Sequence, residues 1–321
     1  MDGMGAMAQG ASTHIPVMRD EVLAGLAVRA DGRYFDGTFG RGGHTRAILD
    51  RLDTGGRLLL MDRDADAIAE AQHAFAHDPR VSIYHGNFAD AGDWNEVRDL
   101  DGALLDLGVS SPQLDDPERG FSFQHDAPLD MRMDRGSGIS AADFLQSADE
   151  REIADVLWRY GEERMSRRIA RAIVAQRAQF PIQSTRELAE LVEHTIGRRE
   201  RNKHPATRTF QALRIHVNDE LGSLQRGLRA IAAALKPGGR LAVISFHSLE
   251  DRIVKNFIRG EMPVPARRGL PRGLPLPQTL HSPLRAIGRA QFPSGAEIAA
   301  NPRARSAVLR IAEKISLEAG G

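Results

Sequence analysis

The most informative segment of the sequence for the fold class is Arg33-Tyr-Phe-Asp-Gly-Thr-Phe-Gly-Arg-Gly-Gly-His44. Its first four residues are typical of a short buried strand, and glycines dominate the turn that follows them. Glycine lets a backbone turn tightly and approach a ligand closely, and a helix beginning after the turn would offer free N–H groups. A turn of this kind fits a nucleotide-type ligand, but it also fits a ligand-free turn in any α/β protein.

The sequence outward from this stretch alternates short apolar runs with helical patterns. Strands are predicted at residues 33–36, 57–62, 81–85 and 102–107, with a helix at 65–76. This order indicates βα units arranged around a parallel sheet.

The alternation stops after Ser110, and no convincing strand is found before about Pro205. Helices are predicted instead, at residues 141–158, 163–177 and 185–194. The alternation of helices and strands then returns, with a helix at 218–235, a Lys236-Pro-Gly-Gly239 turn, a strand at 241–246, a helix at 249–259 and a strand at 306–312. Six prolines between Met262 and Leu284 mark an irregular segment. The sequence therefore predicts a helical domain inserted between the fourth and fifth strands. Because ligands bind at the carboxyl ends of such strands, this domain should overhang the active site.

Asp62 ends the second predicted strand, twenty positions after Gly42. A carboxylate there is placed to accept hydrogen bonds from both hydroxyls of a ribose. The structural alternative is helix capping, because Asp62 or Asp64 precedes the next predicted helix. Together with the glycine turn, this pattern fits NAD as well as S-adenosylmethionine (SAM).

Three later features favour SAM. Asn87-Phe88 follows the third strand, where an amide and a flat ring would suit adenine. The turn Leu235-Lys-Pro-Gly-Gly-Arg240 is common in SAM-dependent methyltransferases. Asp106-Leu-Gly-Val-Ser-Ser-Pro-Gln113 follows the fourth strand, where enzymes that methylate exocyclic amines carry a short polar-proline motif that Ser111-Pro112 loosely resembles.

Ser110 and Ser111 are the candidate catalytic residues. The lone pair of an exocyclic amine is delocalised, so hydrogen-bond acceptors near its N–H groups help it to become nucleophilic. SAM supplies a charged leaving group, so alignment and electrostatics can carry much of the rate. A simple turn remains the alternative role for both serines.

Ser245-Phe-His-Ser-Leu-Glu-Asp251 resembles an acid–base cluster, but Ser248 followed by Asp251 is typical of a helix N-cap. We therefore expect Glu250 and Asp251 to be structural, and Phe246 and His247 to lie where they could contact a target base. The eleven histidines show no metal-ligand spacing, and no metal is expected.

Composition bounds the class of protein. The chain has 321 residues and no cysteine, which excludes disulfides and thiolate sites. No run approaches the ~20 apolar residues of a membrane helix, and residues 1–13 resemble a loose tail rather than a signal peptide. A cytoplasmic protein without membrane partners is the expectation.

The two halves of the chain carry opposite charge. Residues 1–150 hold 13 basic and 27 acidic residues, whereas residues 151–321 hold 30 and 16. The basic residues concentrate in Arg198–Thr209 and at Arg164, Arg167, Arg168 and Arg171. This asymmetry favours phosphate contact by the second half, although attraction between opposite faces of one globule and a solvated loop are the alternatives.

Several long motifs resemble the bacterial small-subunit ribosomal RNA methyltransferase H family, also called the MraW family. They are His14-Ile-Pro-Val17, Asp36–His44, Met61–Asp64, Asp106–Pro117, Gly120–Phe123, Leu129–Asp134, His204–Gln211, Ile244–Val254 and Asn301–Arg305. The matches run from about residue 14 to about residue 312 with no departure at a motif position; residues 1–13 and 261–279 are unmatched.

The resemblance implies N4-methylation of a cytidine in the decoding region of 16S rRNA, within the small ribosomal subunit, with SAM as methyl donor. It implies cofactor contacts at Gly42, Gly43, His44, Asp62, Phe88, Asp106 and Gln113; of these, His44 and Gln113 rest mainly on the resemblance. The implied fold is an α/β, Rossmann-like class I SAM-dependent methyltransferase core, residues 14–112 and 213–321, with an inserted α-helical domain, residues 113–212, that recognises the substrate.

Three other functions fit parts of the pattern. A DNA amino-methyltransferase would use the same chemistry, but no separate helical reader with base-contacting spacing is found. A NAD-dependent oxidoreductase would need a residue pair for hydride chemistry, and none is obvious. A non-catalytic RNA-binding protein would not need the glycine turn and Asp62. No oligomeric state is predicted.

Overall fold

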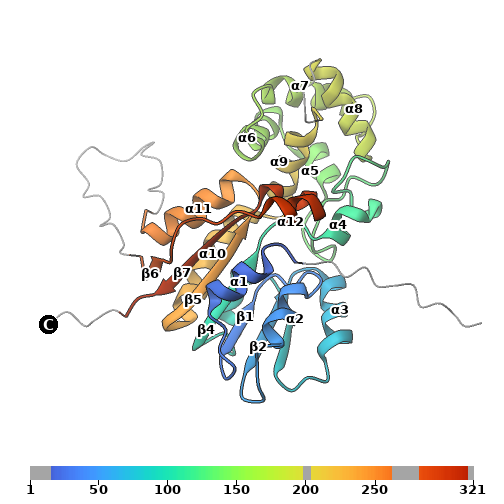
Figure 1. The fold of residues 1–321 in the computed structure, drawn as a ribbon. Coiled ribbons are helices and arrows are strands. Elements are labelled where there is room, and N and C mark those ends of the chain that lie inside the picture. The colour runs from blue at the N-terminus through green and yellow to red at the C-terminus, as the bar shows by residue number, and fades with distance from the viewer. Residues whose placement is uncertain (1–15, 198–203, 262–281, 317–321) are drawn as a thin grey trace, which may run out of the picture.

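The computed structural model describes residues 16–197, 204–261 and 282–316, and these form one seven-stranded sheet flanked by helices (Figure 1). The expected tail at residues 1–13, the basic residues 198–203 and most of the proline-rich segment lie outside the described residues. The strands are β1 (Arg33–Asp36), β2 (Arg57–Asp62), β3 (Val81–His85), β4 (Leu100–Asp106), β5 (Leu235–Ser245), β6 (Leu284–Ala286) and β7 (Val308–Lys314).

The sheet runs in the order β3-β2-β1-β4-β5-β7-β6. The pairs from β3 to β5 are parallel, whereas β7 is antiparallel to both of its neighbours. The parallel α/β arrangement expected from the sequence is therefore confirmed. The order reverses between β1 and β4, and ligands bind at such a switch point in open α/β sheets.

Helices cover both faces of the sheet. The elements of the core are α1 (Arg19–Leu26), α2 (Gly43–Leu49), α3 (Ala65–Phe75), η1 (Phe88–Asp93), α10 (Glu220–Ala234), α11 (Ser248–Arg259), α12 (Gly295–Ala300) and η3 (Pro302–Ser306). Strand β2 shows how two-sided burial is encoded: Leu58 and Leu60 join one hydrophobic cluster, whereas Leu59 and Met61 join the other. A continuous apolar run is the expected pattern of a strand that is buried on both faces.

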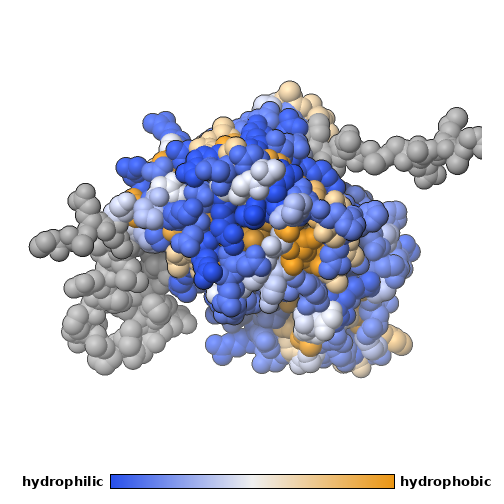
Figure 2. Space-filling view, turned by 90° about the horizontal axis from the view of Figure 1, so that it is seen from below, coloured by the Kyte–Doolittle hydropathy of each residue, from blue (hydrophilic) through white to orange (hydrophobic). Residues whose placement is uncertain are grey.

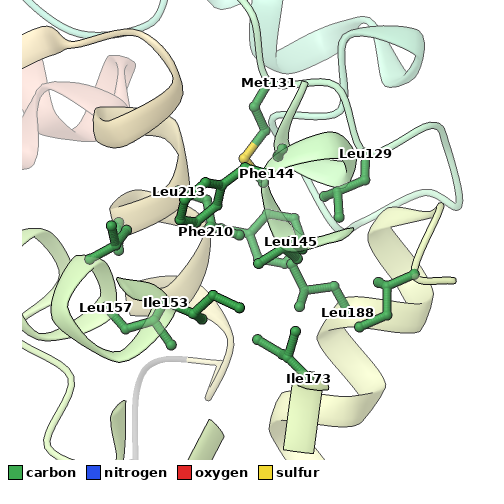
Figure 3. Close-up of a cluster of buried hydrophobic side chains, with 14 of the residues drawn as sticks. Leu129, Met131, Phe144, Leu145, Ile153, Leu157, Ile173, Leu188, Phe210 and Leu213 are labelled. Atoms are coloured by element: carbon green, nitrogen blue, oxygen red, sulfur yellow. The ribbon is translucent and has the colours of Figure 1, made fainter. Parts of the chain in front are cut away.

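A separate group of helices is inserted between β4 and β5 (Figure 1). It begins with the short elements α4 (Ser111–Asp115) and η2 (Pro117–Arg119) and continues with α5 (Ala141–Ser147), α6 (Glu150–Gly161), α7 (Ser166–Arg177), α8 (Thr185–Ile196) and α9 (Thr207–Val217). These helices enclose their own core, in which Leu145, Ile153, Leu188 and Phe210 are buried (Figure 3). The expected inserted helical domain is thus present.

Local chemistry moves several of the expected boundaries. The single helix expected at 141–158 is two helices, because the side chain of Asp149 accepts a hydrogen bond from the Glu152 N–H and starts α6 separately. The Lys236–Gly239 turn lies inside β5, which already pairs Leu235 with Leu100 before a register shift. Strand β6 lies at the end of the proline-rich segment, where the sequence indicated no strand.

The face of the molecule in Figure 2 is mostly hydrophilic, with a smaller hydrophobic area. In the described residues, no helix combines the length and the apolar character needed to cross a membrane.

Candidate cofactor and substrate site

A cavity of about 410 Å³ lies at the carboxyl ends of β1, β2, β4 and β5. Residues from these four strand ends line it, including Gly37, Asp62, Asp106 and Phe246. Of the residues predicted from the sequence, it brings together Gly43, His44, Asp62, Phe88, Asp106, Ser110, Ser111 and Gln113. Gly42 is not part of the lining.

Gly42 instead shapes the turn that carries the lining residues. It precedes α2 with φ of 68°, a left-handed conformation that favours glycine. A Cβ atom at this position would lie 2.6 Å from the ring of Phe39. The glycine is therefore required by the backbone and by the buried aromatic ring beside it.

Asp36 stabilises the glycine turn by hydrogen bonds. Its side chain is buried and accepts hydrogen bonds from the Thr45 hydroxyl at 2.7 Å and the Thr38 N–H at 3.2 Å. The Thr38 hydroxyl in turn accepts from the Asp106 N–H at 2.6 Å. Burial raises the pKa of Asp36 to about 6, even though these hydrogen bonds oppose the shift.

Asp62 and Asp64 divide the two roles that the sequence left open. Asp64 is the N-cap of α3 and accepts from the Asp66 N–H. Asp62 accepts from the Gly40 N–H at 2.8 Å and from the Asp64 N–H at 2.9 Å, so it ties the glycine turn to the end of β2. Its carboxylate also lines the cavity, and burial raises its pKa.

Gln113 and Arg119 form a buried network that sequence reasoning did not find. The Gln113 side-chain amide donates to Asp64 Oδ2 at 2.7 Å, and Arg119 Nη1 donates to the same oxygen at 2.9 Å. Gln113 Oε1 also accepts from the Ser110 N–H, which completes a capping box at the start of α4. The network joins the first turn of the insertion to the end of β2. No periodicity or spacing identifies Arg119, because its partner lies 55 residues away in the chain.

Phe88 starts η1 and packs against α10. A Cβ atom at Gly227 would lie 2.4 Å from the Phe88 ring, so the glycine makes room for it. The neighbouring Asn87, which the sequence placed near adenine, uses its side chain within the protein: it accepts from the Ala89 N–H and donates to Ser223. Only Phe88 of this pair lines the cavity.

His44 and Asp106 meet at the switch point of the sheet. His44 Nε2 lies 3.8 Å from Asp106 Oδ2, and the imidazole is only 6% exposed. Both imidazole nitrogens and Asp106 Oδ1 are buried and have no hydrogen-bond partner in the described part of the chain. Burial raises the pKa of Asp106 to about 8, with Asp36 and Glu250 adding to the shift, and lowers the pKa of His44 to about 4. At pH 7 both groups are therefore neutral.

The β5 side of the cavity carries a charged cluster of Arg214, Glu220 and Glu250. Arg214 and Glu220 were not identified from the sequence. Arg214, on α9, donates from Nε and Nη2 to the two oxygens of Glu220, both at 2.8 Å. Glu250 Oε2 accepts from the backbone N–H groups of Phe246 at 2.8 Å and His247 at 3.3 Å. Hydrogen bonding and nearby positive charge lower the pKa of Glu250 despite its burial.

The N-cap expected at Ser248 is wrong by one residue. Helix α11 begins at Ser248 and its N-cap is His247, with Glu250 at the third helical position reaching back to the cap backbone. Asp251 pairs with Arg310 on β7, at 2.7 and 3.0 Å. Glu250 and Asp251 thus both stabilise the start of α11, in agreement with the structural role expected for them.

Among the described residues, one group of possible metal ligands comes together: Glu220, His247 and Glu250, with ligand atoms within 4.8 Å of one another. Arg214 already holds both oxygens of Glu220. The charge that would attract a metal ion to Glu220 is therefore already paired.

The four arginines expected to contact phosphate are exposed on α7 and just before it. Arg164, Arg167, Arg168 and Arg171 all belong to the insertion, and Arg171 lies 3.7 Å from Glu150 in an exposed ion pair. Ion pairs of this kind contribute little to stability, so these side chains remain available to a polyanion.

Comparison with known proteins places this geometry in a family. The family model described as the MraW methylase family matches residues 11–315. A relative from Stenotrophomonas maltophilia, named Ribosomal RNA small subunit methyltransferase H, is 57% identical over 98% of this chain and 97% of its own length. One of the same name from Xanthomonas axonopodis pv. citri is 57% identical over 98% of this chain and 91% of its own.

Among solved structures, a putative methyltransferase from Streptococcus mutans in complex with SAH is 11% identical, with a TM-score of 0.43, over 94% of this chain and 99% of its own. The sheet order, the antiparallel β7 and the family match agree with the expected class I methyltransferase core. The chain belongs to the MraW methylase family.

Proposed function

We propose that this protein transfers the methyl group of SAM to the exocyclic N4 amine of a cytidine in the decoding region of 16S rRNA. The relatives named as small-subunit ribosomal RNA methyltransferases support the RNA substrate. The observation that carries the proposal is one cavity that Asp62, Phe88 and Asp106 line together with Phe246, which follows β5.

The residues present suit SAM. Asp62 is placed to accept from the ribose hydroxyls, and Phe88 offers an apolar ring for adenine. Gly43 and His44 give backbone N–H groups at the start of α2, with Gly42 shaping their approach. Asp106 Oδ1 and the His44 nitrogens are buried polar atoms without a hydrogen-bond partner among the described residues, and a polar ligand would satisfy them. Gln113 would act through Asp64, to which its amide is bonded.

SAM supplies an electrophilic methyl group on a positively charged sulfur, and the protein residues hold the acceptor amine. Ser110 and Ser111 line the cavity directly beyond Asp106. Their hydroxyl oxygens are our candidates to accept hydrogen bonds from the amine and direct its lone pair. Ser110 Oγ already accepts weakly from the Gln113 N–H at 3.5 Å, so the cap and an amine would share its lone pairs. Exclusion of water by the overlying insertion would strengthen these interactions.

The insertion is the proposed reader of the RNA. Arg164, Arg167, Arg168 and Arg171 present guanidinium groups to phosphate, which fix position rather than sequence. We propose the division into a core of residues 14–112 and 213–321 and an insertion of residues 113–212. Residue 212 falls inside α9, so this helix would connect the two parts directly.

The experiment is to incubate the protein with methyl-labelled SAM and small ribosomal subunits that lack the modification, beside naked 16S rRNA and DNA. Nucleoside mass spectrometry identifies the product. Label in N4-methylcytidine from the subunits is the expected result. Label only in DNA, or in another nucleoside, would reject the proposal while leaving the methyltransferase family intact.

A further inference from the structure

The cavity has a second polar edge that SAM alone does not explain. Neighbouring strands are about 4.8 Å apart. The cavity lies over the ends of β2, β1, β4 and β5, which are adjacent in this order, so it extends over three such spacings. Asp62 and Phe88 lie at one side and Phe246 and Glu250 at the other, with Asp106 between them. Asp62 and Asp106 would hold the ribose and the charged end of the cofactor, which would leave the β5 side for the methyl acceptor.

The side chains on this side are largely buried and are held in place by hydrogen bonds. The side chains of Arg214 and Glu220 are 17% and 8% exposed, and that of Glu250 is 3% exposed. Glu220 receives both hydrogen bonds of the guanidinium fork, and Glu250 adds further negative charge that raises the pKa of Arg214. The fork is therefore fixed in orientation and always charged.

Arg214 retains a donor that the described residues leave unused. Its Nε and Nη2 are used on Glu220, while Nη1 makes no hydrogen bond to any residue that the structure describes. Arg214, Glu220 and Glu250 all line the cavity. A guanidinium next to a carboxylate thus presents donors and acceptors side by side to whatever occupies the space.

Such an edge is complementary to cytosine. The N4 amine of cytosine donates hydrogen bonds, whereas the N3 and O2 atoms of the same base accept them. Uracil carries an acceptor, O4, in place of the amine and a donor at N3, so both contacts would be reversed. Discrimination is large when a buried polar site is left unpaired by the wrong substrate.

We propose that the Arg214–Glu220 pair reads the base edge of the target cytidine, with Arg214 Nη1 donating to N3 and Glu220 accepting from the N4 amine. This inference rests on the proposed function and assigns the specificity-determining residues of the same site. It also gives a role to α9, which joins the insertion to the core and carries Arg214 just after the proposed boundary.

The test pairs a variant with a modified substrate. Wild-type protein and Arg214→Met are assayed on small-subunit RNA that carries, at the target position, either cytidine or 3-deazacytidine, which lacks the N3 acceptor. For wild type we expect 3-deazacytidine to lower kcat/KM by about 10- to 100-fold, the range for the loss of one hydrogen bond from a charged donor. Arg214→Met should show a similar loss on cytidine and no further loss on 3-deazacytidine, with unchanged affinity for SAM.

The comparison of two substrates separates recognition from folding and from intrinsic reactivity of the amine. Arg226→Met is the matched control. Arg226 lies on α10, the helix that begins at Glu220, and its ion pair with Asp219 is exposed. Arg214→Lys keeps the charge and replaces Arg214→Met if the latter does not fold; it should also respond less than wild type to 3-deazacytidine.

Equal responses to 3-deazacytidine in wild type and both Arg214 variants would overturn the proposed contact. Failure of the proposed function is distinguishable, because wild type would then place no label in N4-methylcytidine on the unmodified substrate.

Discussion

His44 Nε2 and Asp106 Oδ2 lie 3.8 Å apart at the switch point of the sheet, although 62 positions separate the two residues. Neither is charged at pH 7, because burial moves their pKa values in opposite directions, to about 4 and about 8. The cavity therefore holds a protonated carboxyl group at the place where a positively charged cofactor is proposed to bind.

This relationship predicts proton release on cofactor binding. A cation beside Asp106 favours its carboxylate and lowers its pKa, so SAM affinity should rise with pH until about pH 8. Binding at pH 7 should release a proton, which calorimetry in buffers of different ionisation heat detects. The amine of SAM also titrates near this pH. The comparison is therefore with Asp106→Asn, which should lose the part of the proton release and of the pH dependence that Asp106 contributes. An identical pH profile in both proteins would contradict the assignment.

Asp62→Ala should weaken SAM binding strongly while the protein stays folded. Each hydrogen bond to a charged group contributes roughly 1.5–3 kcal/mol, so losing the ribose contacts should cost more than about tenfold in Kd. Asp66→Asn is the control, because the Asp66 side chain is 83% exposed. Calorimetry with the two variants decides the matter: equal affinities would remove Asp62 from the ribose site.

Gly227→Ala should weaken SAM binding through Phe88. Alanine favours a helix by about 1 kcal/mol over glycine, but its Cβ would lie 2.4 Å from the Phe88 ring and must displace it. We expect a several-fold loss of affinity without loss of helix content. Gly92→Ala, whose Cβ would meet only Ala230 at 3.7 Å, should bind SAM normally. A normal Gly227→Ala variant would show that the ring position does not matter.

Arg119→Met should destabilise the fold far more than removal of a surface arginine. Arg119 and its partner Asp64 are 4% and 8% exposed, and breaking one side of a buried pair costs about 3–5 kcal/mol. Arg303 pairs with Asp115 at 2.5 Å, but the side chains are 47% and 63% exposed, so Arg303→Met should cost about 0–1 kcal/mol. Urea unfolding of both variants measures the difference, and similar midpoints would refute it.

Charge reversal of Arg167 and Arg168 should raise the KM for RNA and leave SAM affinity unchanged. Each lost phosphate contact should also flatten the dependence of log K on log salt by about 0.7–0.9. Arg229→Glu, an exposed change on α10 of the core, is the control. If the salt dependence is the same in all three proteins, the arginines on α7 are only a solvated face.

The order of the helices and strands, and the strand ends that form the site, could be predicted from the amino-acid sequence. Strands β1, β2 and β3 begin and end where the sequence predicts. In β2, burial on both faces leaves an unbroken hydrophobic signal, whereas the residues of the edge strand β3 are only partly buried or exposed. Asp62 and Asp106 could be identified because each ends a strand, and the glycine turn because it directly follows one. The helical insertion was visible as a long gap in the alternation of strands and helices.

Tertiary structure alone decided how the polar groups are used. Asp64 rather than Asp62 caps α3, Gln113 is bonded to Asp64, and Arg119, Arg214 and Glu220 reach the site or its supports without a local signal. Apolar periodicity records which face of an element is buried, and that property is local. The partner of a buried charge is set by which strand ends and helices meet in space, so residues such as Asp64 and Arg119 become a pair only when the chain has folded.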